Sequence, residues 1–169
     1  MSTRTIIKDG QAVQDTWTHL DDEPLAGPSR QPISVSWGRW TEQSPTLLEL
    51  AHAGRPVGLR IPTDLGPEEL IDYLPHLSLV AIEIPKFADG RFFSTARLLR
   101  MRHGYRGELR ARGDVLPDQL AYMRRVGFDA FELKPGKSLD TALRVLNGFS
   151  VAYQGAEDVG PLFRRRRSA

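Results

Sequence analysis

The stretch GELRARGDVLPDQLAYMRRVGFDAFEL, residues 107–133, changes its hydrophobic period twice. Residues 108–113 alternate between charged and apolar or small side chains, which is typical of a β-strand. A helical spacing follows (Leu116, Leu120, Met123 and Val126), and DAFEL, residues 129–133, alternates again. Two strands joined by one helix form a β-α-β unit, so we predict that the two strands are parallel.

The same alternation of strand and helix extends in both directions along the chain. Strands are predicted at ISVSW, VGLRI, LVAIEI, GELRAR, DAFEL and SVAYQ (33–37, 57–61, 79–84, 107–112, 129–133 and 150–154). Helices are predicted between them, at residues 44–54, 66–77, 94–104, 117–127 and 139–148. We therefore expect an α/β fold with a mainly parallel sheet of about six strands, either open and doubly wound or shaped like part of a barrel.

The first residues show a hairpin pattern. Asp9-Gly10 lies between two apolar runs, and both residues tolerate the positive φ that a type I′ turn requires. We divide the chain into an N-terminal β-hairpin (1–20), a linker (21–32), an α/β domain (33–155) and a basic C-terminal tail (156–169). The residues expected in the core include Ile82, Ile84, Leu109, Leu120, Ala130, Leu133 and Val151.

Composition excludes several classes of protein. The chain has 169 residues, of which 40% are hydrophobic and 26% charged, as in a soluble domain. No apolar run reaches the roughly 18 residues of a membrane span, and the first residues lack the apolar segment of a signal peptide. We expect a cytoplasmic protein without membrane association. The RRRR run at 164–167 favours a solvated tail over a nucleic-acid-binding segment.

The cofactor of the chain, if it has one, is not identified by any motif. There is no cysteine, so the chain cannot hold an iron–sulfur cluster by itself. The four histidines lie far apart without metal-ligand spacing, and we predict no metal site. The glycine fingerprint of dinucleotide-binding loops is also missing.

Charged residues gather in the segments that follow the predicted strands. In parallel α/β folds, ligands bind outside the carboxyl ends of the strands. The segments concerned are IPTDLGP, PKFADGR, RARGDVLP and LKPGKS. We predict that they form one shallow polar pocket for a small anion, lined by Lys86, Asp89, Arg91, Arg112, Asp114 and Lys134. The alternative is that each has an ordinary role: Asp114 as a helix cap, Asp89 in a turn and the lysines as surface charges.

The motifs IIKDG, PKFADGR, YRGELRARGDVLPDQL, GFDAFEL, FSVAYQ and PLFRRR occur together in the chain. With these motifs the chain resembles the bacterial DUF934 family, a domain of unknown function whose members are commonly labelled oxidoreductases of sulfite reduction. The family usually has glycine where this chain has Phe92. Such proteins are typically encoded beside assimilatory sulfite reductase and a phosphoadenylylsulfate or adenylylsulfate reductase.

The resemblance implies a role in sulfur assimilation and cysteine biosynthesis. We expect an accessory protein of assimilatory sulfite reduction that binds one of these reductases or a small anion. The first alternative is an oxidoreductase that delivers electrons or hydride to sulfite reductase. A weaker alternative is a nucleic-acid-binding regulator.

Overall fold

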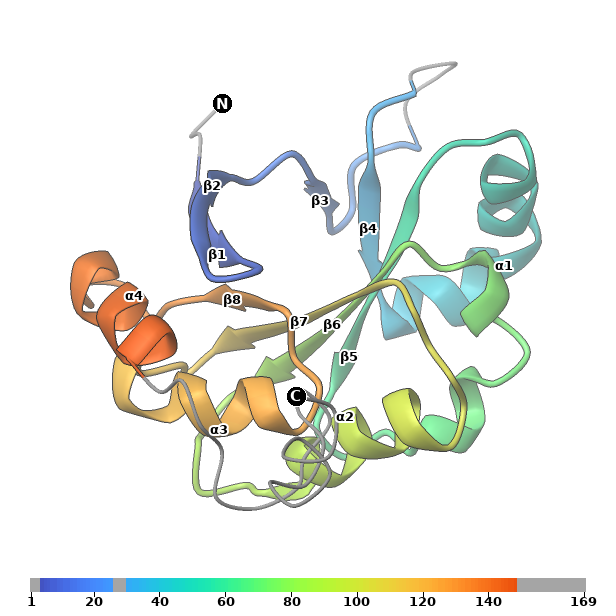
Figure 1. The fold of residues 1–169 in the computed structure, drawn as a ribbon. Coiled ribbons are helices and arrows are strands. Elements are labelled where there is room, and N and C mark those ends of the chain that lie inside the picture. Colours follow the sequence, from blue (N-terminus) through green and yellow to red (C-terminus); the bar gives the residue numbers. More distant parts are fainter. Residues whose placement is uncertain (1–3, 26–29, 149–169) are drawn as a thin grey trace, which may run out of the picture.

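The computed structural model describes residues 4–25 and 30–148 (Figure 1). Within them, eight strands form one sheet in the order β2-β1-β8-β7-β6-β5-β4-β3. Figure 1 shows that this sheet is curled, like half of a barrel. The predicted strand SVAYQ and the basic tail lie outside the described residues.

Six strands follow one another in chain order, and each runs parallel to the next. They are β3 (Thr18–Leu20), β4 (Ile33–Ser36), β5 (Val57–Pro62), β6 (Leu79–Ile84), β7 (Glu108–Gly113) and β8 (Ala130–Glu132). The order never reverses, so the sheet has no switch point between two halves wound in opposite directions. The doubly wound alternative is therefore wrong, and the partial barrel is confirmed.

The N-terminal hairpin belongs to the same sheet. Its strands β1 (Thr5–Lys8) and β2 (Gln11–Gln14) are joined by the expected turn, in which φ is 50° at Asp9 and 77° at Gly10. β1 also pairs with β8 in the antiparallel direction. The expectation of a mainly parallel sheet of about six strands is wrong, because the hairpin adds two antiparallel strands and makes the eight-stranded sheet mixed.

The helices lie along the outer side of the curled sheet (Figure 1). They are α1 (Trp37–His52), α2 (Arg91–Met101), α3 (Leu120–Arg125) and α4 (Leu139–Gly148), with short 3-10 helices η1 (Pro67–Leu70), η2 (Leu74–His76) and η3 (Pro117–Gln119). None of the described helices is long and apolar enough to cross a membrane.

Three helix predictions need correction. α2 covers Arg91–Met101 rather than residues 94–104, so Ser94 lies inside the helix. Proline is involved in the other two. α1 begins at Trp37 rather than near residue 44, because the Ser36 hydroxyl caps it by accepting the Arg39 N–H at 3.3 Å. Pro45 is tolerated just after a kink at Gln43. The predicted helix at 66–77 is instead two 3-10 helices, since Pro75 lies in the second and cannot donate a helical hydrogen bond.

The alternation along each strand divides the sheet into an outer face, which packs on the helices, and an inner face. Of the predicted core residues, Ile82, Ile84, Leu109, Leu120 and Ala130 are buried. Leu133 is only partly buried, because it lies just beyond the end of β8, and Val151 lies outside the described residues.

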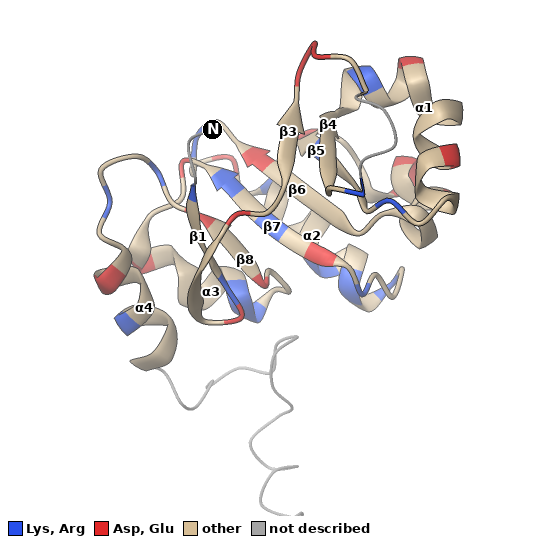
Figure 2. Ribbon diagram, turned by 90° about the horizontal axis from the view of Figure 1, so that it is seen from above, with Lys and Arg blue, Asp and Glu red and all other residues tan. Residues whose placement is uncertain are grey.

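The inner face carries charged residues, which Figure 2 shows on adjacent strands. Arg110 on β7 is 1% exposed and binds Asp15, which is 3% exposed, through both terminal nitrogens at 2.8 and 3.1 Å. Its Nε donates to Glu108 at 2.8 Å. Trp17 packs over Gly58 on β5, where a Cβ would lie 3.0 Å from the indole ring. The segment between β2 and β3 therefore covers the inner face.

Asp15 is ionised in this buried position. Burial alone would raise the pKa of its carboxyl, but hydrogen bonds from His19 and Arg110 hold that pKa below its usual range.

The His19 ring also contacts the hydroxyl of Ser34 at 2.6 Å. This Asp15–His19–Ser34 chain has the residue types of a nucleophilic triad, but Ser34 is fully buried and Arg110 occupies the carboxylate, so the chain has a structural role.

We predict that Asp15→Asn lowers the free energy of unfolding at pH 7 by about 1.5–3 kcal/mol, because buried Arg110 keeps only the carboxylate of Glu108 and loses its charge-assisted contacts with Asp15. Because the pKa of the Asp15 carboxyl is lower in the folded than in the unfolded protein, its ionised form stabilises the fold at any pH above the unfolded pKa. This stabilisation is lost as the pH falls below that value. The difference in free energy of unfolding between Asp15→Asn and the parent protein should therefore become smaller below about pH 4. Urea denaturation at several pH values measures this difference, and Asp72→Asn, at an exposed position, is the control. An equal loss at pH 7 and pH 3 would contradict the ion-pair argument.

We predict that Leu120→Ala lowers the free energy of unfolding by about 2–5 kcal/mol, because Leu120 is completely buried where α3 packs on the sheet. Chemical denaturation of the purified variant measures this loss. A loss below about 0.5 kcal/mol, the size typical of surface substitutions, would show that α3 does not contribute to the core.

Candidate functional site

The predicted site residues lie at the carboxyl edge of the parallel strands, where they form two separate hollows. Arg112, the next-to-last residue of β7, lines both hollows. Asp89 and Arg91 line one of them, and Lys134 lines the other. Lys86 is exposed and lines neither.

The first hollow, which we call the acidic hollow, has a volume of about 510 Å³. Arg91 donates to both oxygens of Asp89 at 2.8 Å, and the Thr63 hydroxyl donates at 2.6 Å. Hydrogen bonds from Arg91 and Thr63 hold the pKa of Asp89 below its usual range. Asp64 and Glu83 add two more carboxylates. The hollow is therefore a poor site for an anion, since Arg91 is already paired.

The second hollow, which we call the strand-end hollow, has a volume of about 380 Å³. Its charged lining residues are Arg4, Arg112, Lys134, Lys137 and Glu132. Four of these side chains are cationic and one is anionic. Leu139, the first residue of α4, also lines it, which places the positive end of the helix dipole beside the basic residues.

Local sequence shapes the loop that carries the two lysines. The Lys137 N–H donates to the Lys134 carbonyl at 3.2 Å, which closes a turn over Pro135 and Gly136. Gly136 has φ of 81°, as the third residue of a type II turn requires. Ser138 then caps α4 by accepting the Thr141 N–H at 3.2 Å. The sequence LKPGKS thus places both lysines beside the start of a helix.

Arg112 is a partly buried cation of the strand-end hollow that lacks a well-formed hydrogen bond. Its Nε lies 3.5 Å from a Glu132 oxygen and its Nη1 lies 3.8 Å from Glu83, too far for well-formed hydrogen bonds. No described residue accepts a hydrogen bond from its guanidinium, and Nη1 is buried without a partner. The side chain as a whole is 22% exposed, so part of it remains open to a ligand.

Asp114 connects two loops and does not cap a helix. One of its oxygens accepts the Phe87 N–H at 3.0 Å, and the other accepts the Lys134 ammonium at 3.0 Å. The Phe87 N–H, and then Lys134, hold the pKa of Asp114 below its usual range. The loops after β6 and after β8 are therefore held together beside the end of β7.

One cluster of side chains satisfies the spacing of a metal site. Ligand atoms of Asp15, His19 and Glu132 lie within 4.8 Å of one another. However, Arg110 binds Asp15, and Arg4 binds Glu132 at 2.7 Å. These guanidinium groups already supply the positive charge that a metal ion would bring, so the cluster does not support a metal centre.

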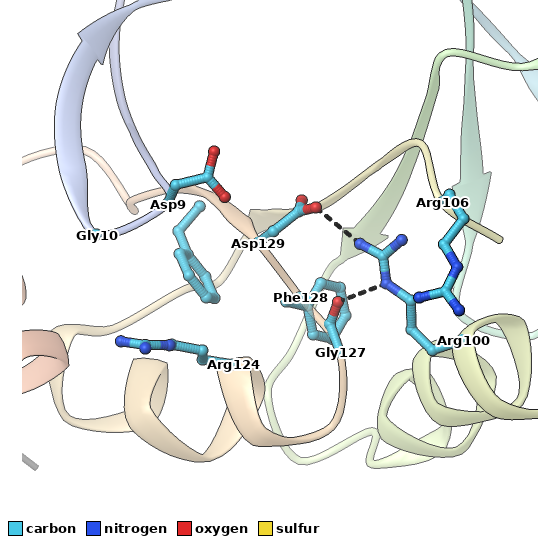
Figure 3. A pocket seen from close by; sticks show the side chains of 9 residues that line it. Asp9, Gly10, Arg100, Arg106, Arg124, Gly127, Phe128 and Asp129 are labelled. Atoms are coloured by element: carbon cyan, nitrogen blue, oxygen red, sulfur yellow. Dashed lines mark hydrogen bonds and ion pairs between the residues drawn. The ribbon is translucent and has the colours of Figure 1, made fainter. Parts of the chain in front are cut away.

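At the opposite edge of the strands, a hollow of about 430 Å³ lies beside the hairpin turn (Figure 3). Arg100 on α2 lines this hollow and makes most of its hydrogen bonds. Its nitrogens donate to the carbonyls of Tyr105, Gly107 and Gly127 and to the Asp129 carboxylate, at 2.7–2.9 Å. Arg100 is therefore a clamp between α2 and the loops before β7 and β8, and four of its five N–H donors are used within the protein.

The family model of DUF934, a bacterial protein of unknown function, matches residues 58–163. The chain belongs to this family. Among curated proteins, none matches the chain. Phe92, where the family usually has glycine, is buried in the aromatic part of the core against Phe87 and Phe128. It lines neither hollow at the strand ends, so this substitution leaves both hollows open.

Sequence reasoning missed Arg4, Glu132 and Lys137. Lys137 could have been found, because it lies between a Pro-Gly turn and a helix cap. Arg4 could not, because its position depends on the pairing of β1 with β8.

We predict that Asp114→Ala lowers the free energy of unfolding by about 1–3 kcal/mol, since the Phe87 N–H loses its acceptor. Lys134→Ala should cost less than about 1 kcal/mol, because the lysine is half exposed. Guanidinium denaturation compares the two variants. Equal losses would mean that the contact with Phe87 adds nothing beyond the ion pair.

Proposed function

We propose that the protein is an accessory protein of assimilatory sulfite reduction that binds a small oxyanion in the strand-end hollow. The observation that carries this proposal is the charge of the hollow: four cationic side chains surround one carboxylate. Arg112 among them donates no hydrogen bond to any described residue. Arg4 is paired with Glu132 and Lys134 with Asp114, so an oxyanion with two or more oxygens would take its hydrogen bonds chiefly from Arg112 and Lys137.

The link to sulfur comes from the family resemblance, since such proteins are typically encoded beside sulfite reductase. Sulfite and sulfate are small and doubly charged, and both suit a cluster of guanidinium and ammonium groups beside a helix N-terminus. The absence of cysteine favours binding over thiol-based redox chemistry. If the protein also binds the sulfite reductase encoded beside it, the bound anion would lie close to the enzyme that uses it.

We predict that the protein binds sulfite and sulfate at low salt, as measured by isothermal titration calorimetry. Arg112→Gln and Lys137→Ala should each weaken binding about tenfold, because each removes a charge-assisted contact. Lys86→Ala is the matched control, since Lys86 lies at the same edge but outside the hollow. Binding that is unchanged in both hollow variants would exclude this site.

A growth experiment tests the biological role separately. Deletion of the gene should slow growth on sulfate but not on cysteine, and the parent gene should restore growth better than the Arg112→Gln gene. Normal growth of the deletion strain on sulfate would refute the role in sulfite reduction. A yellow purified protein, or one whose absorbance changes with NADPH, would instead favour the oxidoreductase alternative.

A further inference from the structure

A second, chemically different hollow lies at the amino edge of the parallel strands. It has a volume of about 360 Å³ and lies between η2 and the loop that connects α2 to β7. We call it the apolar hollow after its aliphatic wall, although polar and apolar atoms line it about equally. One wall consists of Ile71, Leu74, Pro75 and Leu77, and the other is the segment from His103 to Gly107.

The two walls of the apolar hollow are held in place by the fold. The Tyr105 hydroxyl donates to the Leu77 carbonyl at 3.2 Å, which connects one wall to the other. Gly107 allows this contact, because a Cβ there would lie 2.2 Å from the Tyr105 oxygen. Gly104, with φ of 63°, turns the chain shortly after α2 ends at Met101. The hollow is therefore preformed.

The charge of this hollow differs from that of the other three. Arg106 is its only fully charged lining residue, and no carboxylate lines it. Arg106 is exposed and makes no hydrogen bond or ion pair with the described residues. It lies between two hollows, because it also lines the hollow of Arg100, where Figure 3 shows it beside that residue. His103 adds a ring Nε2 that is buried and has no partner among the described residues.

The opposite wall supplies apolar surface. Ile71 is 44% exposed, although it is a large aliphatic residue, and Pro75 beside it is also exposed. Burying such a surface against a ligand is favourable in proportion to the apolar area removed from water. A ligand that suits both walls carries one negative charge and a short apolar body.

We propose that the apolar hollow binds a small monocarboxylic acid, with its carboxylate on Arg106 and its hydrocarbon part against Ile71 and Pro75. Arginine can hold a carboxylate through two parallel hydrogen bonds. The volume lies within the range of sites for small molecules, about 300–1,000 Å³. This site is separate from the strand-end hollow, which has four cations and suits a smaller, more highly charged anion.

The test uses pentanoate, acetate and 1-pentanol as probes in ligand-observed NMR titrations of the full chain. Pentanoate should bind about tenfold or more tightly than acetate, because acetate lacks the methylene groups that Ile71 would cover. It should also bind more tightly than 1-pentanol, which lacks the charge. Absence of pentanoate binding, or equal binding of pentanoate and acetate, overturns the proposal.

Variants locate the site. Arg106→Gln should weaken pentanoate binding about tenfold, and Ile71→Ser should reduce the preference for pentanoate over acetate. Both residues are exposed, so both variants should fold, which circular dichroism checks. Arg102→Gln, an exposed arginine outside the hollow, is the matched control. Pentanoate binding that survives Arg106→Gln unchanged refutes the proposal. Arg112→Gln should affect sulfate binding only, so the two sites can fail independently.

Discussion

The buried ion pair between Asp15 and Arg110 is the contact on which the arrangement of this molecule depends. It joins a segment near the N-terminus to the middle of β7, and almost no solvent reaches either side chain. A cation buried on the inner face of a sheet is costly unless it has a partner. Glu108 and Asp15 together supply the carboxylates that bind Arg110, and the contact with Asp15 holds the segment between β2 and β3 across the inner face, where Trp17 covers Gly58.

The same anchoring explains why the strand-end hollow contains residues from both ends of the described chain. The Asp15 N–H donates to the Arg4 carbonyl, and the Arg4 side chain reaches Glu132 beside the hollow. The region that the family model matches begins at residue 58, so Arg4 lies outside it. The part of the chain before the matched region thus contributes one of the four cations of the proposed anion site. The segment between β2 and β3 lies over the inner face, and the four hollows described above lie at the two ends of the strands.

The sequence predicts the alternation of strands and helices well, because hydrophobic period and turn residues are local properties. The Asp9-Gly10 turn and the β-α-β unit at 107–133 are examples. It does not predict that β1 pairs with β8, since strand pairing between distant segments leaves no local pattern. The six predicted site residues share one edge because strand direction fixes that edge. Only Asp89, Arg91, Arg112 and Lys134 line a hollow there, and which hollow each one lines depends on side-chain contacts such as Asp89–Arg91. Lys86 lies at the predicted edge but lines neither hollow, so a position at the edge is not enough to identify a site residue.

The pairing of β1 with β8 also bears on the order in which the molecule can be assembled during its synthesis. Ile7 leaves the ribosome well before its partner Phe131. The pairing of β1 with β8 therefore closes a long loop, which is slow compared with forming neighbouring strand pairs. Arg4 and Lys137 lie on opposite sides of that closure, so the strand-end hollow depends on it. A chain cut short before β8 would keep much of its parallel sheet and yet lack the complete strand-end hollow.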